Sequence, residues 1–281
     1  MRLSGAAIVA GVMGWPVAHS RSPALHGFWI AEHGIDGAYV PMAVKPEHLR
    51  RALEALPLLG FAGCNLTIPH KEAALEIVDE IDASARRAGA INTVVVDAHG
   101  RLSGRNTDIF GFLEALRAAR PGWSAAIGPA VVIGAGGAAR AVVAALIDDG
   151  APEIRLVNRT PARAASLAKE LGGPVLGATW ERRAEALQGA ALLVNATSLG
   201  MAGQPALELA LDLLPREAVV NDIVYAPLET PLLAAARQRG NFAVDGLDML
   251  LHQARPGFAA WFGVEPQVTP ALRRAVLATL E

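Results

Sequence analysis

Features that would tie a chain to an oxidising compartment or a membrane are scarce here. Cys64 is the one cysteine among 281 residues, so no disulfide can form within the chain, which favours a reducing compartment. The longest apolar stretch, residues 130–147, is interrupted by a glycine turn and by Arg140, so it does not resemble a membrane span. Gly11 and Gly14 break up the apolar residues near the start, unlike in a signal peptide. We therefore expect a cytoplasmic protein with no membrane contact.

An excess of charge of one sign is also lacking. The formal net charge is −2 and the charges are scattered without a basic run, so the chain has no general attraction for nucleic acid or anionic lipid. The histidines show no metal-ligand spacing, so no metal site is expected. Hydrophobic residues make up 52% of the chain, beside 28 glycines and 18 prolines, which fits a large core with many turns. A length of 281 residues suits two domains.

Short apolar runs alternate with helical patterns along most of the chain, which predicts an α/β fold with mostly parallel sheets. Expected strands lie at residues 8–12, 39–42, 61–67, 93–96, 131–133, 154–157, 191–194 and 219–223. Expected helices lie at residues 47–56, 71–78, 109–118, 246–253 and 270–280. A further helix begins at Ser22, with the serine as its cap and Pro23 as its first residue. Pro256 should break or kink the helix that precedes it.

A glycine turn follows the apolar run at residues 131–133. Gly134, Gly136 and Gly137 lead from that expected strand into an expected helix. Glycines in this place let backbone N–H groups approach a dinucleotide pyrophosphate, and the helix N-terminus favours its negative charge. The pattern predicts a Rossmann-like dinucleotide site.

The residues after the next strand indicate which dinucleotide is bound. An NAD site places an acid there for the ribose hydroxyl, whereas an arginine accommodates the 2′-phosphate of NADP. This chain has Asn158, Arg159 and Thr160 and no acid, and Arg163 falls in the first turn of a helix that would start at Pro161. Two guanidiniums can grip one phosphate, so we expect NADP(H), although both arginines could instead be merely solvated.

Seven further segments, in this order, resemble signatures of the shikimate dehydrogenase family. They are residues 14–26, 65–71, 89–93, 104–108, 195–201, 222–227 and 246–253. The resemblance implies an N-terminal, mostly parallel α/β substrate-binding domain, residues 1–107, to which the C-terminal helices, about 251–281, return. Residues 108–250 would form the Rossmann-like NADP-binding domain. It also implies reversible reduction of 3-dehydroshikimate to shikimate by NADPH, in the biosynthesis of chorismate and aromatic amino acids. The sequence leaves the oligomeric state open, a homodimer included.

The resemblance implies catalytic roles for two residues. Hydride attack on a carbonyl builds negative charge on oxygen, so an acid must stand within reach of it. Lys71 would be the general acid/base, and Asp108 would orient it. Taken without the family, Lys71 is a solvated lysine in the first turn of a helix, a disfavoured place for a cation, and Asp108 is a cap before Ile109.

The remaining site residues are also implied by the resemblance. Ser20 and Ser22 would bind the substrate carboxylate, Thr67, Asn92 and Gln253 its ring hydroxyls, and Tyr225 would line the pocket. Gly134, Gly136 and Gly137 would border the pyrophosphate, Asn158, Arg159, Thr160 and Arg163 the 2′-phosphate, and Met201 and Gly246 the nicotinamide. Simpler roles stay open: a helix cap for Ser22, a turn for Asn92, an exposed helix position for Gln253, and core packing for Tyr225 and Met201.

Three other functions fit parts of the pattern. A quinate/shikimate dehydrogenase of broader specificity would favour NAD, which the arginines argue against. A catalytically silent NADP(H)-binding sensor would not need Lys71 and Asp108. A methylenetetrahydrofolate dehydrogenase would not need Ser20 and Ser22. Gly27 and residues 255–257 depart from the family pattern and could alter the pocket edge or the domain hinge.

Overall fold

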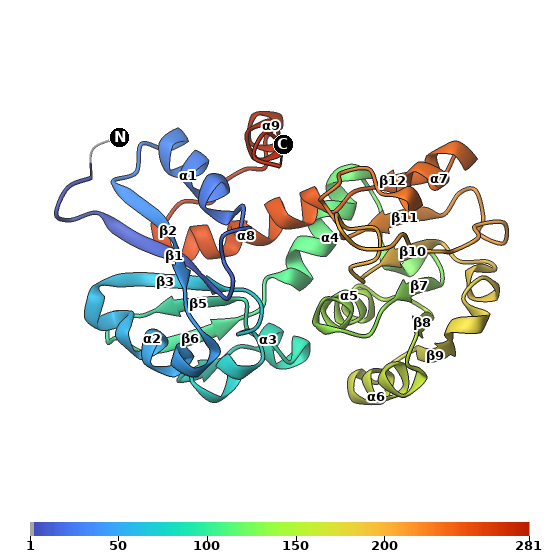
Figure 1. Cartoon of the computed structure of the whole chain (residues 1–281), viewed down its shortest axis with the longest axis horizontal. Coiled ribbons are helices and arrows are strands. Elements are labelled where there is room, and N and C mark those ends of the chain that lie inside the picture. The colour runs from blue at the N-terminus through green and yellow to red at the C-terminus, as the bar shows by residue number, and fades with distance from the viewer. Residues whose placement is uncertain (1–2, 281) are drawn as a thin grey trace. The chain divides into compact units, whose positions relative to one another are not determined.

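The computed structural model describes residues 3–280. Met1, Arg2 and Glu281 fall inside the predicted domain ranges but lie outside the described residues. The chain divides into two compact units (Figure 1). The first combines Met1–Thr107 with Leu251–Glu281, and the second is Asp108–Leu250. Across the described residues we find no helix that is both long and apolar enough to span a membrane.

The first unit is built on a mixed sheet with the strand order β2-β1-β3-β5-β6-β4. Its strands are β1 (Ile8–Gly14), β2 (Gly37–Ala43), β3 (Phe61–Leu66), β4 (Glu80–Ile81), β5 (Thr93–Val96) and β6 (Leu102–Arg105). Its helices are α1 (Ser22–Glu32), α2 (Leu49–Ala55), α3 (Ala83–Ala88), α9 (Pro270–Leu277) and most of α8 (Leu247–Phe262). β1 pairs in parallel with β2 and β3, and β4 with β6. The expected mostly parallel sheet is present, but β5 runs antiparallel to both of its neighbours.

The antiparallel part comes from a hairpin that the apolar pattern missed. Between β5 and β6, Asp97 Oδ1 accepts hydrogen bonds from the N–H groups of His99 and Arg101, and Gly100 takes a φ of +78°. An aspartate that binds backbone N–H groups two residues on, followed by a glycine with positive φ, is turn chemistry. β6 is short and half-polar, so its periodicity gave no strand signal.

The second unit is a parallel six-stranded sheet with helices on both faces. Its strands are β7 (Ala130–Ile133), β8 (Ile154–Asn158), β9 (Val175–Thr179), β10 (Leu192–Asn195), β11 (Val219–Asp222) and β12 (Phe242–Val244), in the order β12-β11-β10-β7-β8-β9. Numbered within the unit, this is the Rossmann order 3-2-1-4-5-6 read from the β9 edge. The predicted Rossmann-like domain is therefore confirmed.

Two apolar layers cover the faces of this sheet. Helices α4 (Asp108–Ala119), α5 (Gly137–Asp148) and α6 (Pro161–Leu171) pack on one face. Helix α7 (Pro231–Arg239) and the segments around Leu187 and Leu211 pack on the other. Alternate residues of one strand enter opposite layers, as Val131 and Val132 of β7 do. Burial on both faces explains why β7 and β10 read as apolar runs in the sequence, whereas the edge strand β9 is largely exposed.

The helix expected at residues 71–78 is wrong. Only a 3₁₀ turn, Ala73–Glu76, forms there. Directly after it the Asp79 N–H donates to the carbonyl of Leu102, and the Asp79 carboxylate accepts from the Leu102 N–H. These bonds draw the chain into β4 beside β6, so tertiary pairing overrides a short stretch with helical propensity.

Two smaller expectations, a cap at Ser22 and a break at Pro256, are also wrong. Ser22 is the first residue of α1 and does not cap it, and its N–H donates to Ser20 Oγ at 3.3 Å. Helix α8 is not broken at Pro256 but continues to Phe262. Beyond the proline, Phe258 and Trp261 are buried, and Arg255 Nε donates to the carbonyl of Pro266. This packing offsets the hydrogen bond that the proline cannot donate.

An aromatic cluster in the first unit surrounds a fully buried histidine. The ring of His26 on α1 stacks on Tyr39 of β2 at 3.9 Å and 7°, and it meets the edge of Trp29 at 5.8 Å. Burial lowers the pKa of His26 to about 3, and Asn65 opposes this shift. Neither ring nitrogen makes a hydrogen bond of ordinary geometry within the described chain, so the opposition is weak. His26 is therefore neutral in the folded protein.

This neutral histidine should make the fold sensitive to acid. Because the pKa of His26 is depressed in the folded state, the unfolded chain takes up a proton below its own pKa of about 6.5 and the folded chain does not. Stability is therefore lost as pH falls from about 6.5 towards 3. We expect a loss of roughly 3 kcal/mol between about pH 7 and about pH 4 from this group.

Urea unfolding of the wild type and of His26→Phe at both pH values measures this contribution. The phenylalanine cannot take up a proton, so the variant should lose less stability on acidification than the wild type does. Other groups titrate equally in both proteins, so the difference between the two losses isolates His26. Equal losses would contradict the assignment.

Candidate active site

The predicted site residues fall into two sets, one in each unit. Ser20, Ser22, Thr67, Lys71, Asn92 and Gln253 belong to the first unit. Asp108, Tyr225 and all the predicted cofactor residues belong to the second. The two sets are described in turn.

The turn that carries Thr67 and Lys71 is anchored on both sides. It follows β3, where the Thr67 N–H donates to the carbonyl of Met13 and the Thr67 carbonyl accepts from the His70 N–H. His70 is buried, with Nε2 2.8 Å from the carbonyl of Val44. The Lys71 carbonyl accepts from the N–H of Ile91 at 2.7 Å. Lys71 is half-buried in this turn and not on a helix, so the expected unfavourable helix-end position does not arise.

A buried amide network joins Asn92 to Gln253. Asn92 lies directly before β5 and is 2% exposed. Its Nδ2 donates to Thr107 Oγ1 at 3.0 Å and to Gln253 Oε1 at 3.4 Å. Its Oδ1 accepts from the Thr107 N–H at 2.8 Å and from Thr93 Oγ1 at 3.0 Å. The simpler roles are therefore wrong: Asn92 is not merely a turn residue, and Gln253 is half-buried and bonded.

Several members of this network were not predicted as site residues. Asn65 donates from Nδ2 to the carbonyl of Asn92 and to Thr93 Oγ1, and its Oδ1 accepts from the hydroxyl of Tyr39 at 2.5 Å. Asn65, Thr93 and Thr107 stand inside the family signatures, so their buried polar character could have drawn attention to them. Tyr39 lies in an apolar strand and carried no such signal.

The two serines lie at the start of α1. Ser22 is buried and Ser20 is half-buried. Gly27, a departure from the family pattern, lies in the next turn of α1 and is exposed, and a Cβ there would meet no atom within 4 Å. Replacing the residue that the family pattern has here by glycine therefore removes no packing contact.

In the second unit the glycine turn has the geometry that a dinucleotide requires. Gly134 takes a φ of +114°, and a Cβ there would lie 2.9 Å from the carbonyl oxygen of Ala196. Gly136 occupies the position before α5, and a Cβ on Gly136 or Gly137 would meet nothing within 4 Å. The unpaired N–H groups at the start of α5 therefore face open space, which suits an anionic pyrophosphate.

The arginines after β8 are available for a phosphate. Arg159 and Arg163 are exposed, and neither guanidinium is paired within residues 3–280. By contrast, Arg140 on α5 is paired with Glu170 at 2.7 Å. Asn158 Nδ2 donates to the carbonyl of Thr160 at 3.0 Å, which orders the turn before α6. Helix α6 begins at Pro161, so Arg163 lies in its first turn as predicted.

A buried carboxylate ties together the loops that carry Met201 and Tyr225. Asp222 accepts from Asn195 Nδ2 at 2.9 Å and from Thr230 Oγ1 at 2.7 Å. Burial raises the pKa of Asp222, and hydrogen bonds from Thr230, the Val224 N–H and Asn195 oppose the rise.

The predicted nicotinamide residues lie at or beside these loops. Met201 is 41% exposed, so its alternative role in core packing is wrong. Tyr225 is half-buried. Gly246 has no room for a side chain, because a Cβ would lie 2.2 Å from the carbonyl oxygen of Ile223.

Asp108 is the first residue of α4 and not the cap before it. The preceding residue, Thr107, is held by Asn92.

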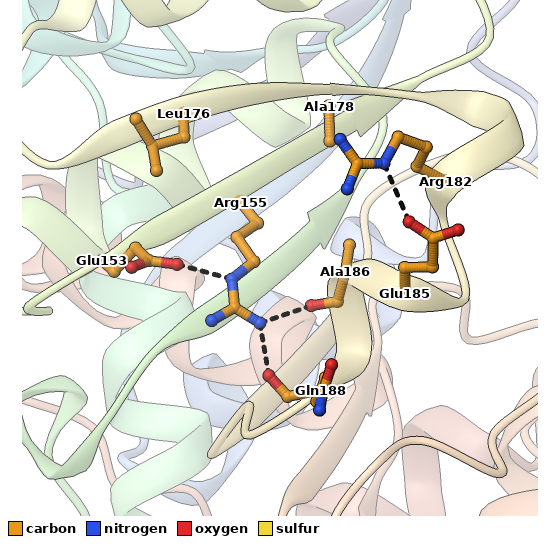
Figure 2. Close-up of a pocket in the computed structure, with 8 residues that line it drawn as sticks. All are labelled: Glu153, Arg155, Leu176, Ala178, Arg182, Glu185, Ala186 and Gln188. Atoms are coloured by element: carbon orange, nitrogen blue, oxygen red, sulfur yellow. Dashed lines mark hydrogen bonds and ion pairs between the residues drawn. The ribbon is translucent and has the colours of Figure 1, made fainter.

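A separate pocket of about 470 Å³ lies on the second unit beside β8 and β9 (Figure 2). None of its lining residues is a predicted site residue. They are Glu153, Arg155, Leu176, Ala178, Arg182, Glu185, Ala186 and Gln188. Arg155 is bound by Glu153 and by the carbonyls of Ala186 and Gln188, and Arg182 is bound by Glu185. Its charged groups are thus satisfied by one another, and it is not the candidate active site.

Comparison with known proteins identifies the family. Residues 12–94 match the model described as the shikimate dehydrogenase substrate binding domain, and residues 124–202 match that of shikimate / quinate 5-dehydrogenase. Shikimate dehydrogenase (NADP(+)) of Paramagnetospirillum magneticum is 63% identical over 98% of this chain and 100% of its own length.

Two solved structures are similar along nearly the whole chain. Shikimate 5-dehydrogenase of Thermus thermophilus, in complex with NADP(H) and shikimate, has a TM-score of 0.86 and 40% identity, covering 98% of this chain and 100% of that one. Quinate dehydrogenase of Corynebacterium glutamicum, in complex with NAD, has a TM-score of 0.90 and 33% identity, covering 97% and 99%. The chain belongs to the shikimate dehydrogenase family, as its ordered signatures predict.

Proposed function

We propose that this chain catalyses the reversible, NADPH-dependent reduction of 3-dehydroshikimate to shikimate, and so serves the biosynthesis of chorismate and aromatic amino acids. The observation that carries the proposal is the pair of exposed arginines after β8, unpaired within residues 3–280, together with a glycine turn that is open at Gly136 and Gly137. A relative 63% identical over nearly the whole chain bears the name shikimate dehydrogenase (NADP(+)). The first unit would bind the substrate and the second the cofactor.

The second unit has the residues to hold NADP(H). Gly134, Gly136 and Gly137 would border the pyrophosphate, because Gly134 makes the tight turn and Gly136 and Gly137 leave open space at the start of α5. Asn158, Arg159, Thr160 and Arg163 would contact the 2′-phosphate, since guanidiniums bind phosphate bidentately. Met201 and Gly246 would border the nicotinamide. When bound, the cofactor supplies the hydride.

The first unit has the side chains to hold a small polyhydroxy carboxylate. Ser20 and Ser22 would bind the carboxylate, and Thr67, Asn92 and Gln253 the ring hydroxyls. Because Asn92 and Gln253 lie in a hydrogen-bonded network, their donors and acceptors are fixed in direction. Such a site rejects analogues that lack a hydroxyl, because its own polar groups then stay unpaired. Tyr225 of the second unit would line the pocket.

The proton is assigned to Lys71. As the ketone of 3-dehydroshikimate is reduced, negative charge develops on its oxygen, and the ammonium of Lys71 would donate a proton to it. In the reverse direction the neutral amine would accept the proton from the shikimate hydroxyl. Asp108 would orient the lysine and share the hydroxyl. The anchored turn after β3 limits the movement of the Lys71 backbone.

The near-ultraviolet absorbance of the reduced cofactor tests the activity directly. Purified protein is mixed with shikimate or quinate and with NADP or NAD, in all four combinations. We expect rapid reduction with shikimate and NADP. Because the chain is similar to a quinate dehydrogenase solved with NAD, quinate oxidation with NAD is the second candidate activity, and the combination of quinate and NAD tests it. Turnover there would assign the broader activity, and binding of NADPH without any turnover would favour a silent sensor.

We further propose a cytoplasmic location and a homodimer. Sedimentation equilibrium measures the assembly, and cell fractionation measures the location. A monomer at micromolar concentration would overturn the homodimer, and recovery in a membrane or secreted fraction would overturn the cytoplasmic location.

A further inference from the structure

We propose that Tyr39 is a positioning residue for the substrate, because its hydroxyl begins a chain of hydrogen bonds that orients the predicted hydroxyl-binding amides. The inference rests on the proposed function and concerns a residue outside the predicted site. Its consequence is that Tyr39 affects the affinity for shikimate and not the chemical step.

The ring of Tyr39 is held rigidly. It lies on β2, is 7% exposed, and stacks on His26 at 3.9 Å and 7°. Trp261 of α8 approaches it at 5.9 Å, and Trp261 is itself fixed by a hydrogen bond from Nε1 to the carbonyl of Val94. Contacts on more than one side leave the phenol hydroxyl a single position.

That hydroxyl determines how the Asn65 amide is oriented. It donates to Asn65 Oδ1 at 2.5 Å, so Nδ2 of Asn65 must face the other way. Nδ2 then donates to the carbonyl of Asn92 and to Thr93 Oγ1, at 3.0 and 3.1 Å. A rotated amide would place an oxygen against that carbonyl and lose the bond to it. The phenol hydroxyl prevents this rotation.

The orientation of the Asn65 amide in turn determines that of the Asn92 amide. Because Thr93 Oγ1 accepts from Asn65, its own proton is directed to Asn92 Oδ1 at 3.0 Å. Asn92 Oδ1 also accepts from the Thr107 N–H, so its Nδ2 is left to face Thr107 Oγ1 and Gln253 Oε1. Thr93 Oγ1 also lies 3.3 Å from Thr107 Oγ1, so these groups form one network, and networks of this kind are worth more than their separate bonds. The chain of bonds ends at two predicted hydroxyl-binding residues.

The protonation state of the phenol follows from its burial. Burial raises the pKa of Tyr39 well above its usual range, the nearby Cys64 adds to the rise, and a hydrogen bond from Ser22 opposes it. The phenol therefore stays protonated and remains a donor to Asn65.

The variant Tyr39→Phe tests the inference, because it keeps the stacked ring and removes only the hydroxyl. We expect the KM for shikimate to rise about tenfold, which corresponds to about 1.4 kcal/mol, with the KM for NADP and kcat changed less than about threefold. Thr93→Val interrupts the same chain of bonds one residue further on and should show the same pattern. If Tyr39 and Thr93 act through the same chain of bonds, the KM for shikimate of the double variant should be little higher than that of either single variant.

The matched control is Trp29→Phe. It also removes a buried hydrogen bond of the aromatic cluster, from Nε1 to the carbonyl of Gln267, but it does not touch the amide network. It should lower the melting temperature and leave the KM for shikimate unchanged. A KM for shikimate that is unaltered in Tyr39→Phe, in a wild type that reduces NADP with shikimate, would overturn the inference alone. A wild type that neither turns over nor binds shikimate would overturn the proposed function as well.

Discussion

Replacing Lys71 with alanine is expected to lower kcat for shikimate oxidation by about 10²–10⁴-fold, the range that a positioned general acid/base contributes. Without the amine, no side chain is assigned to take the hydroxyl proton as the ketone forms. The KM for shikimate should change little, because the serines and the amide network would still bind the carboxylate and ring hydroxyls. Steady-state rates with saturating NADP and varied shikimate give both constants.

Lys169→Ala is the control for the loss of a lysine. Lys169 is exposed near the end of α6, outside every proposed contact, so its removal should leave kcat and both KM values unchanged. Because Lys71 lies in a turn held by backbone bonds and not in a helix, its substitution should also leave the melting temperature close to that of the wild type. Near-normal turnover in Lys71→Ala would remove the lysine from the mechanism.

Removing both arginines after β8 is expected to abolish the preference for NADP. In Arg159→Ala/Arg163→Ala the KM for NADP should rise about 10²–10⁴-fold, since hydrogen bonds to charged groups are worth about 1.5–3 kcal/mol each and two guanidiniums are lost. The KM for NAD, which has no 2′-phosphate, should stay within about threefold. The ratio of kcat/KM for the two cofactors reports the change without depending on the amount of active enzyme.

Arg182→Ala supplies the matched control for that double variant. Arg182 is exposed and paired with Glu185 beside the separate pocket, so its loss removes a positive charge from the same unit at a place with no proposed cofactor contact. It should leave the cofactor ratio unchanged. Equal losses with NADP and NAD in the double variant would instead indicate a damaged glycine turn, and no loss with either would end the phosphate assignment.

The Rossmann-like unit shows how far local sequence signals reach. Strands β7 and β10 are buried along their whole length, so they appear as apolar runs, and helices follow β7, β8 and β11 in the next stretch of chain. Gly134 needs a positive φ and a close approach to the carbonyl of Ala196, a requirement that only glycine meets. Both signals belong to neighbouring residues, which is why residues 131–137, taken together with Asn158 and Arg159, indicated a dinucleotide-binding fold.

The first unit shows where such signals end. The Asp79–Leu102 bonds that replace the expected helix at residues 71–78 join residues 23 positions apart. Helix α8 passes Pro256 because Phe258 and Trp261 bury their rings against other elements. Intrinsic propensities of a few tenths of a kcal/mol to about 3 kcal/mol per residue are overridden once such contacts form.

The sequence by itself determined the family, the dinucleotide-binding turn and the kind of phosphate that it should accept, because these depend on short motifs in which adjacent residues do the work. Only the tertiary structure decided that Asn92 and Gln253 are joined, that Arg159 and Arg163 are unpaired within residues 3–280, and that the hydroxyl of Tyr39 donates to Asn65. Hydrogen bonds between strands and helices far apart in the chain depend on which groups the packing brings within about 3 Å, and no local pattern encodes that choice.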